Sequence, residues 1–325
     1  MNNDKDTTQR VQQTRDIQRQ QDQKDVEAPQ SDEKSAVQAG ARKQPEQLPE
    51  QHIAKPGNEH ELELTPQHTA PNYKGSGKLE GFATLITGGD SGIGRSVAIL
   101  FAREGADVAI VYLNEDEDAE HTKHHVEKEG RRCLLIRGDV TDMAFCHSAV
   151  DQTVNAFGRL DVLVNNAAFQ EHADSIEQLT EERFDLTMRT NVYGYFHMAK
   201  AALPHMKNGA SIINTGSVVG LRGSSQLLDY STTKGAIHAF TKALAQQVID
   251  RGIRVNAVAP GPVWTPLNPA DQPAEAMKTW GQGTDMKRVA QPEELSPAYV
   301  FLAAPVCSGY ITGIVLPITG SVEAI

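Results

Sequence analysis

Short apolar runs alternate along most of the chain with longer stretches in which apolar residues recur at helical spacing. The strand-like runs cover residues 82–87, 107–113, 132–137, 161–165, 210–215, 253–259 and 313–318. Parallel strands need a long crossover connection, which is usually a helix. The alternation therefore predicts an α/β fold, a doubly wound parallel sheet covered by helices on both faces, within one domain over residues 73–325.

Residues 1–72 have a different composition. Gln, Asp, Glu, Lys and Arg dominate this segment, and its few apolar residues, such as Val11, Ile17 and Val26, show no periodicity. Such a segment buries too little apolar area to offset the entropy of ordering it. We therefore expect a polar, disordered tail over residues 1–72. A solubilising extension is the favoured role, and binding a partner or wrapping the protein's own oligomer are alternatives.

A glycine-rich turn follows the first strand-like run. It reads Gly88-Gly89-Asp90-Ser91-Gly92-Ile93-Gly94 and precedes a helical stretch at 96–103. Glycines at 88, 92 and 94 permit a tight turn, close approach of the backbone to a pyrophosphate, and close helix–strand packing. The helix N-terminus offers free N–H groups to phosphate. Many glycine turns are only turns, but the position between strand and helix favours a nucleotide site.

Tyr230 and Lys234 lie one turn apart on a second predicted helix, so they share a face. A free tyrosine has a pKa near ~10 and is a poor base at neutral pH. A neighbouring cation favours the phenolate and lowers that pKa, which would make Tyr230 a proton-transfer group. Alone, such a pair would more simply be a surface contact. The other motifs of the chain decide against that interpretation.

Together these motifs resemble the short-chain dehydrogenase/reductase family over roughly residues 73–325. The same order of motifs continues with Asn165-Asn166-Ala167-Ala168 after a strand, Asn191-Val192-Tyr193-Gly194, a strand ending at Ser217, and Val258–Val263 with Thr265. The resemblance implies a Rossmann-like sheet of about seven strands. A dinucleotide would lie across the carboxyl ends of these strands. It also implies a homo-oligomer, most often a tetramer.

The resemblance further implies a catalytic set. Tyr230 would be the acid/base, and Lys234 would lower the pKa of Tyr230 and hold the nicotinamide ribose. Ser217 would bind the substrate oxygen, and Asn191 would hold a water that links Lys234 to solvent. The implied cofactor contacts are Gly88, Asp90, Ser91, Gly92, Ile93, Gly94, Tyr112, Leu113, Asn114, Asp139, Val140, Asn165, Ala167, Tyr230, Lys234, Pro260, Gly261, Val263 and Thr265.

The choice between NAD and NADP depends on the end of the second strand. An acid there would bind the adenosine ribose, and an arginine would bind a 2′-phosphate. The chain has Tyr112, Leu113 and Asn114 instead, which departs from both patterns. Asp90 and the four carboxylates at 115–118 would repel a 2′-phosphate, and Arg95 would partly offset them. NAD is the preferred expectation, and NADP is the alternative.

Composition excludes other partners and settings. The net charge of −11 argues against nucleic acid as a partner. Cys133, Cys146 and Cys307 lack metal-ligand spacing, so we expect no metal site and reduced thiols in a cytoplasmic protein. No apolar run approaches the length of a membrane span, so no membrane partner is expected.

Three segments should wall the substrate pocket: residues 169–172, residues 221–229, and residues 264–287, the last of which we expect to be a mobile lid. Their mixture of apolar and polar side chains suits a small sugar, polyol, aldehyde or ketone. We expect an NAD(P)-dependent oxidoreductase that transfers a hydride to or from such a substrate. A non-catalytic dinucleotide-binding regulator and a stress or interaction protein that acts through its tail are the alternatives.

Overall fold

The computed structural model describes residues 12, 15, 16, 18–20, 23 and 35–322. The chain divides into two units, residues 1–35 and 36–325. The described residues 12–23 of the first unit are helical, and Gln12 Nε2 donates to Asp16 Oδ1 at 3.0 Å. Among the described helices, none has both the length and the apolar character needed to cross a bilayer. All features below belong to the second unit.

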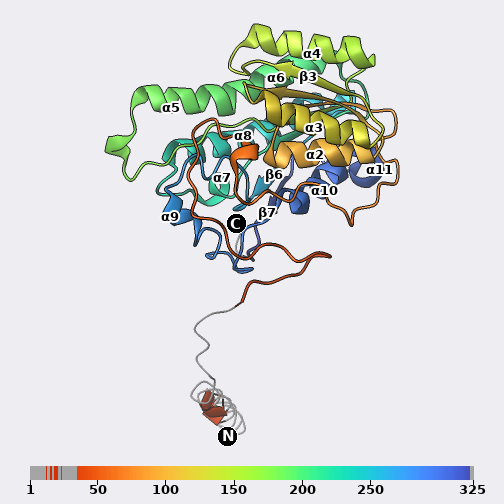
Figure 1. Ribbon diagram of the computed structural model, residues 1–325. Coiled ribbons are helices and arrows are strands. Elements are labelled where there is room, and N and C mark those ends of the chain that lie inside the picture. Colours follow the sequence, from red (N-terminus) through yellow and green to blue (C-terminus); the bar gives the residue numbers. More distant parts are fainter. Residues whose placement is uncertain (1–11, 13–14, 17, 21–22, 24–34, 323–325) are drawn as a thin grey trace, which may run out of the picture. The chain divides into compact units, whose positions relative to one another are not determined.

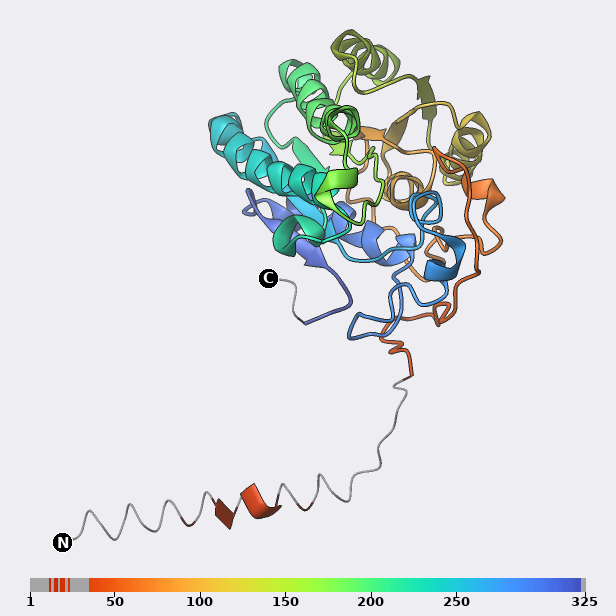
Figure 2. The ribbon, with the colours of Figure 1, turned by 90° about the vertical axis from the view of Figure 1, so that its left-hand side faces the viewer.

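A single sheet of seven parallel strands forms the centre of this unit, in the order β3-β2-β1-β4-β5-β6-β7 (Figures 1 and 2). The strands are β1 (Ala83–Thr87), β2 (Asp107–Tyr112), β3 (Cys133–Arg137), β4 (Val162–Asn165), β5 (Ser211–Thr215), β6 (Arg254–Pro260) and β7 (Val315–Ile318). Each predicted run overlaps one of them, and the predicted doubly wound parallel sheet is confirmed. The strand order reverses between β1 and β4, which opens a crevice at their carboxyl ends.

Helices connect the strands. The α-helices are α2 (Gly92–Arg103), α3 (Asp116–Lys128), α4 (Met143–Phe157), α5 (Glu181–Met188), α6 (Gly194–Ala202), α7 (Val219–Arg222), α8 (Leu228–Val248), α9 (Ala274–Met277), α10 (Pro292–Ala303) and α11 (Pro305–Ser308). Short 3-10 helices are η1 (Glu59–Glu61), η2 (Ile176–Gln178), η4 (Leu203–His205) and η5 (Ile249–Arg251), and one π-helical turn is η3 (Arg189–Tyr193). The π turn joins α5 directly to α6.

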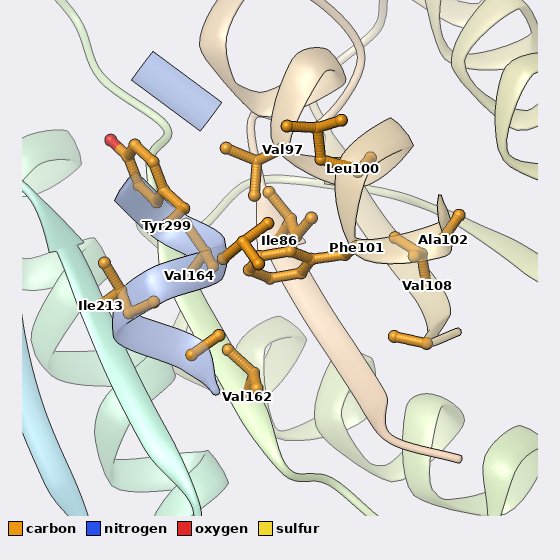
Figure 3. Packing of buried hydrophobic residues seen from close by; sticks show 14 of the residues in the cluster. Ile86, Val97, Leu100, Phe101, Ala102, Val108, Val162, Val164, Ile213 and Tyr299 are labelled. Carbon is orange, nitrogen blue, oxygen red and sulfur yellow. The ribbon is translucent and has the colours of Figure 1, made fainter. Parts of the chain in front are cut away.

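Two apolar layers cover the two faces of the sheet. Successive strand residues point to opposite faces, so Ile86 packs with α2, α3 and α10, whereas Leu85 packs with α4, α6 and α8. Figure 3 shows the first layer, in which Phe101 of α2 and Tyr299 of α10 lie against the strand side chains. Burial on both faces explains why the five central strands are largely apolar in the sequence, whereas the edge strands β3 and β7 are only half-buried.

Residues 36–72, here called the N-terminal strap, pack on the domain. Leu48, Ile53 and Leu62 form an apolar cluster with residues of the 264–289 region, including Trp264. The Trp264 indole Nε1 also donates to the Leu64 carbonyl at 2.7 Å. In Figure 2 the orange-red strap runs beside the blue loops of that region. The predicted disorder is therefore wrong for residues 36–72, because these sparse apolar residues are buried by distant parts of the chain. Most of residues 1–34 lie outside the described residues.

Glu59 fastens the strap to α2 and is only 3% exposed. The Gly92 N–H donates to Glu59 Oε2 at 2.6 Å, and the Arg95 guanidinium binds the other carboxylate oxygen. Arg95 also contacts Asp118 Oδ1 at 3.3 Å. Burial raises the pKa of Glu59, and the charge of Arg95 opposes that rise. The carboxylate thus joins the strap, the start of α2 and α3 in one buried ionic group.

Removing this carboxylate should destabilise the fold. We expect Glu59→Ala to lower the free energy of unfolding by roughly 3 kcal/mol, because it leaves part of a buried charge group unpaired. Glu61→Ala, at an exposed position two residues away, should change it by less than about 0.5 kcal/mol. Urea denaturation of both variants measures the difference. Equal losses would contradict an anchoring role for Glu59.

Candidate active site

A cleft of about 930 Å³ lies where the carboxyl ends of the strands meet the connecting loops. Its walls come from the turns after β1 to β6, from the start of α8, from the 265–284 region and from residues 55–57 of the strap. Dinucleotides bind at this position in open α/β sheets. The predicted position of the site at the sheet edge therefore agrees with the cavity.

The glycine turn forms one end of this cleft. Gly92 has φ +50°, and a Cβ built there would lie 2.9 Å from Thr265 Cγ2. Gly94 lies deeper, where a Cβ would come within 1.9 Å of the Gly88 carbonyl oxygen. Side chains at these two positions would fill the cradle or push α2 off β1. The turn therefore has the close packing that the glycine pattern predicts, and it fits a pyrophosphate group at the N-terminus of α2.

The structure gathers nearly all of the predicted site residues around the cleft. Those that line it are Gly88, Asp90, Ser91, Gly92, Ile93, Tyr112, Leu113, Asn114, Asp139, Val140, Ala167, Ser217, Tyr230, Lys234, Pro260, Gly261, Val263 and Thr265. Gly94, Asn165 and Asn191 do not line it. Asn165 is buried in β4, where its amide donates to Asn214 Oδ1 at 2.9 Å and ties β4 to β5.

Tyr230 and Lys234 lie near the start of α8, on one face as predicted. Lys234 Nζ is 5.3 Å from the centre of the Tyr230 ring, and the lysine is only 1% exposed. Its ammonium group donates to the Thr215 carbonyl at the end of β5 (2.8 Å) and to Tyr195 Oη (3.3 Å). The end of β5 thus fixes the position of the lysine head group beside the tyrosine.

Burial dominates the titration of this pair. It lowers the pKa of Lys234 from 10.5 to about 7. It raises the pKa of Tyr230 above its ordinary value, and the charge of Asp271 adds to that rise. The lysine therefore carries only part of its charge at neutral pH. The predicted lowering of the Tyr230 pKa by Lys234 is not what the protein groups alone produce, since burial and the charge of Asp271 both raise it.

Ser217 and Asn191 occupy distinct positions. Ser217 follows β5, lines the cleft, and accepts a hydrogen bond from the Val219 N–H at 3.3 Å. Asn191 is fully buried in the π turn η3. Its side chain binds both main-chain groups of Phe169 (2.8 and 2.9 Å) and donates to Thr233 Oγ1 at 3.1 Å. Asn191 therefore connects the loop after β4 to α8 at Thr233, the residue before Lys234.

Sequence reasoning missed two side chains that surround Lys234. Tyr195 is buried, donates to the Thr215 carbonyl at 3.0 Å, and accepts from Lys234. His238 is also buried, and burial followed by the charge of Lys234 lowers its pKa to about 4. Tyr195 follows Asn191 by four residues, a spacing that suggests a shared helical face. His238 lies one turn beyond Lys234, which is a comparable signal.

The substrate end has the three predicted walls, with exceptions. Phe169 and Gln170 line the cleft, as do residues 222–227, 265–268 and 280–284 in part. Trp264 does not, because it is fully buried in the apolar cluster under the strap. Glu171 and His172 lie behind the wall. His172 Nδ1 is 2.8 Å from Asp271 Oδ1, and Glu171 pairs with Lys55 at 2.9 Å.

Glu171, His172 and Asp271 are, within the described parts of the chain, the group of potential metal ligands that lie within 4.8 Å of one another. The His172 main-chain N–H and the Gln170 side-chain amide also donate to Asp271. The carboxylate oxygens of Asp271 and Glu171 thus already bind donors of the protein. The three residues form a hydrogen-bonded network that supports the loop at residues 169–172.

The adenosine end of the cleft is acidic. Burial, followed by the charge of Glu115, raises the pKa of Asp90 to about 7. Arg95 does not line the cleft, and its Nε donates to the Asp90 carbonyl at 2.9 Å while the guanidinium binds Glu59 and Asp118. The expectation that Arg95 would offset the repulsion between these carboxylates and a 2′-phosphate is therefore wrong. Its guanidinium is paired with carboxylates of the protein itself.

Comparisons with known proteins agree with this geometry. The protein-family model described as "Enoyl-(Acyl carrier protein) reductase" matches residues 88–321. The chain is 49% identical to "NADPH-dependent aldehyde reductase 1, chloroplastic" of Arabidopsis thaliana, over 81% of this chain and 93% of that protein. It is also 49% identical to "Glucose and ribitol dehydrogenase" of Daucus carota, over 82% of this chain and 94% of that protein.

Solved structures match at lower sequence identity. A short-chain dehydrogenase from Burkholderia cenocepacia J2315 in complex with NADP has a TM-score of 0.71 and 33% identity, covering 75% of this chain and 98% of that one. A 3-ketoacyl-(acyl-carrier-protein) reductase from Brucella melitensis complexed with NADH has a TM-score of 0.69 and 32% identity, covering 76% of this chain and all of that one, 100%.

The burial of Lys234 predicts a pH-dependent stability. The folded-state pKa of about 7 lies below that of the unfolded chain, so the cost of the buried ammonium is full below pH 7 and fades as pH rises toward 10.5. We therefore expect the gain in free energy of unfolding of Lys234→Met over the wild type to be greatest near pH 6. This gain should decline above pH 7. Urea denaturation at several pH values measures it, with Lys242→Met, exposed on the same helix, as control. A pH-independent difference would contradict the assignment.

Proposed function

The chain belongs to the short-chain dehydrogenase/reductase family of oxidoreductases, and we propose that it transfers a hydride between a nicotinamide dinucleotide and a small hydroxylated alcohol or its carbonyl form. One observation carries this proposal: Ser217, Tyr230 and Lys234 line the same cleft as the glycine turn. An acid/base group and a dinucleotide cradle thus share one cavity. A non-catalytic regulator would have no need of the buried tyrosine and lysine.

The cofactor would lie along the cleft. The glycine turn would hold its pyrophosphate, Asp139 and Val140 its adenine, and the Tyr112–Asn114 segment its adenosine ribose. Lys234 would hold the nicotinamide ribose. Pro260, Gly261, Val263, Thr265 and Ala167 would lie on the nicotinamide side. When bound, this group supplies or accepts the hydride, and the protein supplies orientation and electrostatics.

Tyr230 is the proposed proton-transfer group. Because burial raises its pKa, the phenol is protonated at neutral pH, which suits proton donation to a carbonyl oxygen during reduction. In the oxidative direction the phenolate would accept the alcohol proton. Ser217 would donate a hydrogen bond to the same substrate oxygen. Asn191 would hold a water that links Lys234 to solvent, which would complete a proton relay.

A polyhydroxylated substrate fits the lining of the substrate end. Gln226, Asn268 and Gln272 line this part of the cleft, and amide side chains both donate to and accept from hydroxyl groups. Phe169 and Leu227 supply apolar contacts beside them. The names of the carrot and Arabidopsis relatives, a glucose and ribitol dehydrogenase and an aldehyde reductase, support a small sugar, polyol or aldehyde as substrate.

NAD is the proposed preferred cofactor. Asp90 and Glu115 line the adenosine end, and the cations that line the cleft within the described residues, Lys55, Arg189, Arg222 and Lys234, belong to other walls. A 2′-phosphate would meet carboxylates there without a compensating charge. NADP is the alternative, since both cofactors occur among the structural neighbours.

A homotetramer in the cytoplasm is the proposed setting. Apolar side chains are exposed on α5 and α6 (Leu186, Phe196) and on α10, α11 and the following turn (Phe301, Val306, Tyr310). Burying such surfaces between copies would stabilise an assembly. The three cysteines are free of disulfides, which suits a reducing compartment.

Turnover with NAD(H) and NADP(H) against sugars, polyols, alcohols, aldehydes and ketones tests the function. We expect Tyr230→Phe to lose about 10²–10⁴-fold in turnover, the usual contribution of general acid–base catalysis. Cofactor binding should be retained, and Tyr193→Phe, at an exposed position, should be fully active. Wild-type activity in Tyr230→Phe would overturn the assignment. Cofactor binding without any turnover by the wild type would favour a regulator or a tail-based function.

Reversing the charge of Glu115 should change cofactor preference. We expect Glu115→Lys to raise the ratio of kcat/KM for NADP over NAD by at least about tenfold, since it replaces a repulsive charge beside the 2′-position with an attractive one. Glu120→Lys makes the same charge change on the exposed face of α3 and is the control. Equal ratios in both variants would place Glu115 away from the 2′-position.

A further inference from the structure

We infer that the strap forms part of the active site, and that Lys55 is a positioning residue for the substrate pocket. The inference rests on the proposed function in one respect only, that the cleft end lined by Phe169 and Gln170 receives the substrate. Residues 55–57 line the cleft, although they lie in a segment whose composition predicts disorder. The pocket is therefore incomplete without the strap.

The Lys55 ammonium joins two walls of the pocket. It donates to the Gln170 carbonyl at 2.8 Å and to the Ala270 carbonyl at 3.1 Å, and it pairs with Glu171 Oε2 at 2.9 Å. It also lies over the Phe169 ring, 5.3 Å from the ring centre. An ammonium group has three protons, and these three oxygens account for all of them. Lys55 thus acts through the loops that it holds, and no proton is left for a ligand.

The held loops present the side chains that face the substrate. Gln170 turns its side-chain amide to Asp271 Oδ2 at 2.5 Å, and Asp271 is buried. Residues 169–172 are therefore linked to residues 270–271 by the buried Gln170–Asp271 hydrogen bond, by the contacts of His172 with Asp271, and by the Lys55 ammonium. Gly57 approaches the second wall closely, since a Cβ there would lie 3.0 Å from the Pro266 carbonyl oxygen.

Further contacts of the strap hold the 264–287 segment. The Ile53 N–H donates to the Pro269 carbonyl at 3.1 Å, and Glu50 pairs with Lys278 at 2.8 Å. His52 Nδ1 lies 2.9 Å from the Gln272 carbonyl oxygen. Beneath these contacts lies the apolar cluster of Leu48, Ile53, Leu62 and Trp264. The segment predicted as a mobile lid is thus fastened to the strap by hydrogen bonds, an ion pair and an apolar cluster.

Lys55→Met in the full chain tests this role, with Lys43→Met as matched control. Lys43 belongs to the same strap, is 76% exposed in its side chain, and pairs with Glu46 at 3.0 Å. We expect Lys55→Met to raise KM for the carbonyl or alcohol substrate on the order of tenfold, because loosened walls misplace the substrate. NAD(H) affinity, measured by fluorescence titration, should stay unchanged, as should the melting temperature. Lys55→Arg should restore part of the substrate affinity, since it keeps a donor cation.

Hydrogen exchange gives a readout that does not depend on turnover. In Lys55→Met, amides of residues 166–173 and 264–273 should exchange faster than in Lys43→Met and in the wild type, whereas those of α2 should not change. If exchange and KM equal those of the control, the positioning role is wrong. If the melting temperature and the cofactor affinity both fall while KM rises, Lys55 is a general structural residue and the inference is also wrong. If the wild type shows no turnover, the proposed function fails, and the exchange result still decides the role of Lys55.

Discussion

The site depends on one constraint, the close packing of the glycine turn against the other segments at the carboxyl ends of the strands. Gly94 lies so close to the Gly88 carbonyl oxygen that no side chain fits between them, which seats α2 directly on β1. This seating directs the N-terminus of α2 into the crevice between β1 and β4. Gly92 in turn contacts Thr265, so the same turn sets the position of the 264–287 segment. A shift of α2 would therefore move the phosphate cradle and one substrate wall together.

Desolvation is the largest electrostatic effect in the cleft. It lowers the pKa of Lys234 to about 7, raises that of Tyr230, and raises that of Asp90 to about 7. In each case the buried site favours the neutral form. The protein alone thus keeps a protonated phenol beside a partly neutral amine, an arrangement in which proton donation costs less than proton abstraction. A charged or polar ligand in the cleft would change these preferences, which couples ligand binding to protonation.

The sequence predicted the sheet and the shared helical face of Tyr230 and Lys234 because both depend on local patterns. The central strands β1, β2, β4, β5 and β6 are buried on both faces, so they appear as largely apolar runs. Tyr230 and Lys234 share a helical face, and the glycine turn stands between a strand and a helix. The strap was predicted wrongly because its order depends on distant partners. Lys55 contacts Gln170 and Ala270, which lie 115 and 215 residues further along the chain. No local pattern of apolar residues reports such contacts.

The wrong prediction for the strap shows that composition predicts whether a segment can fold by itself, not whether it is ordered in the whole protein. A polar segment cannot build a core of its own, but it can order itself on a surface that supplies the missing apolar and charged partners. Here Trp264 and its neighbours supply the apolar surface, and Arg95 and the Gly92 N–H supply partners for Glu59. Lys55 and Glu59 are four residues apart, a span of at most about 14 Å. This short segment therefore holds both the substrate wall, through Lys55, and the glycine turn, through Glu59. A shift of one of these two parts of the site would displace the other.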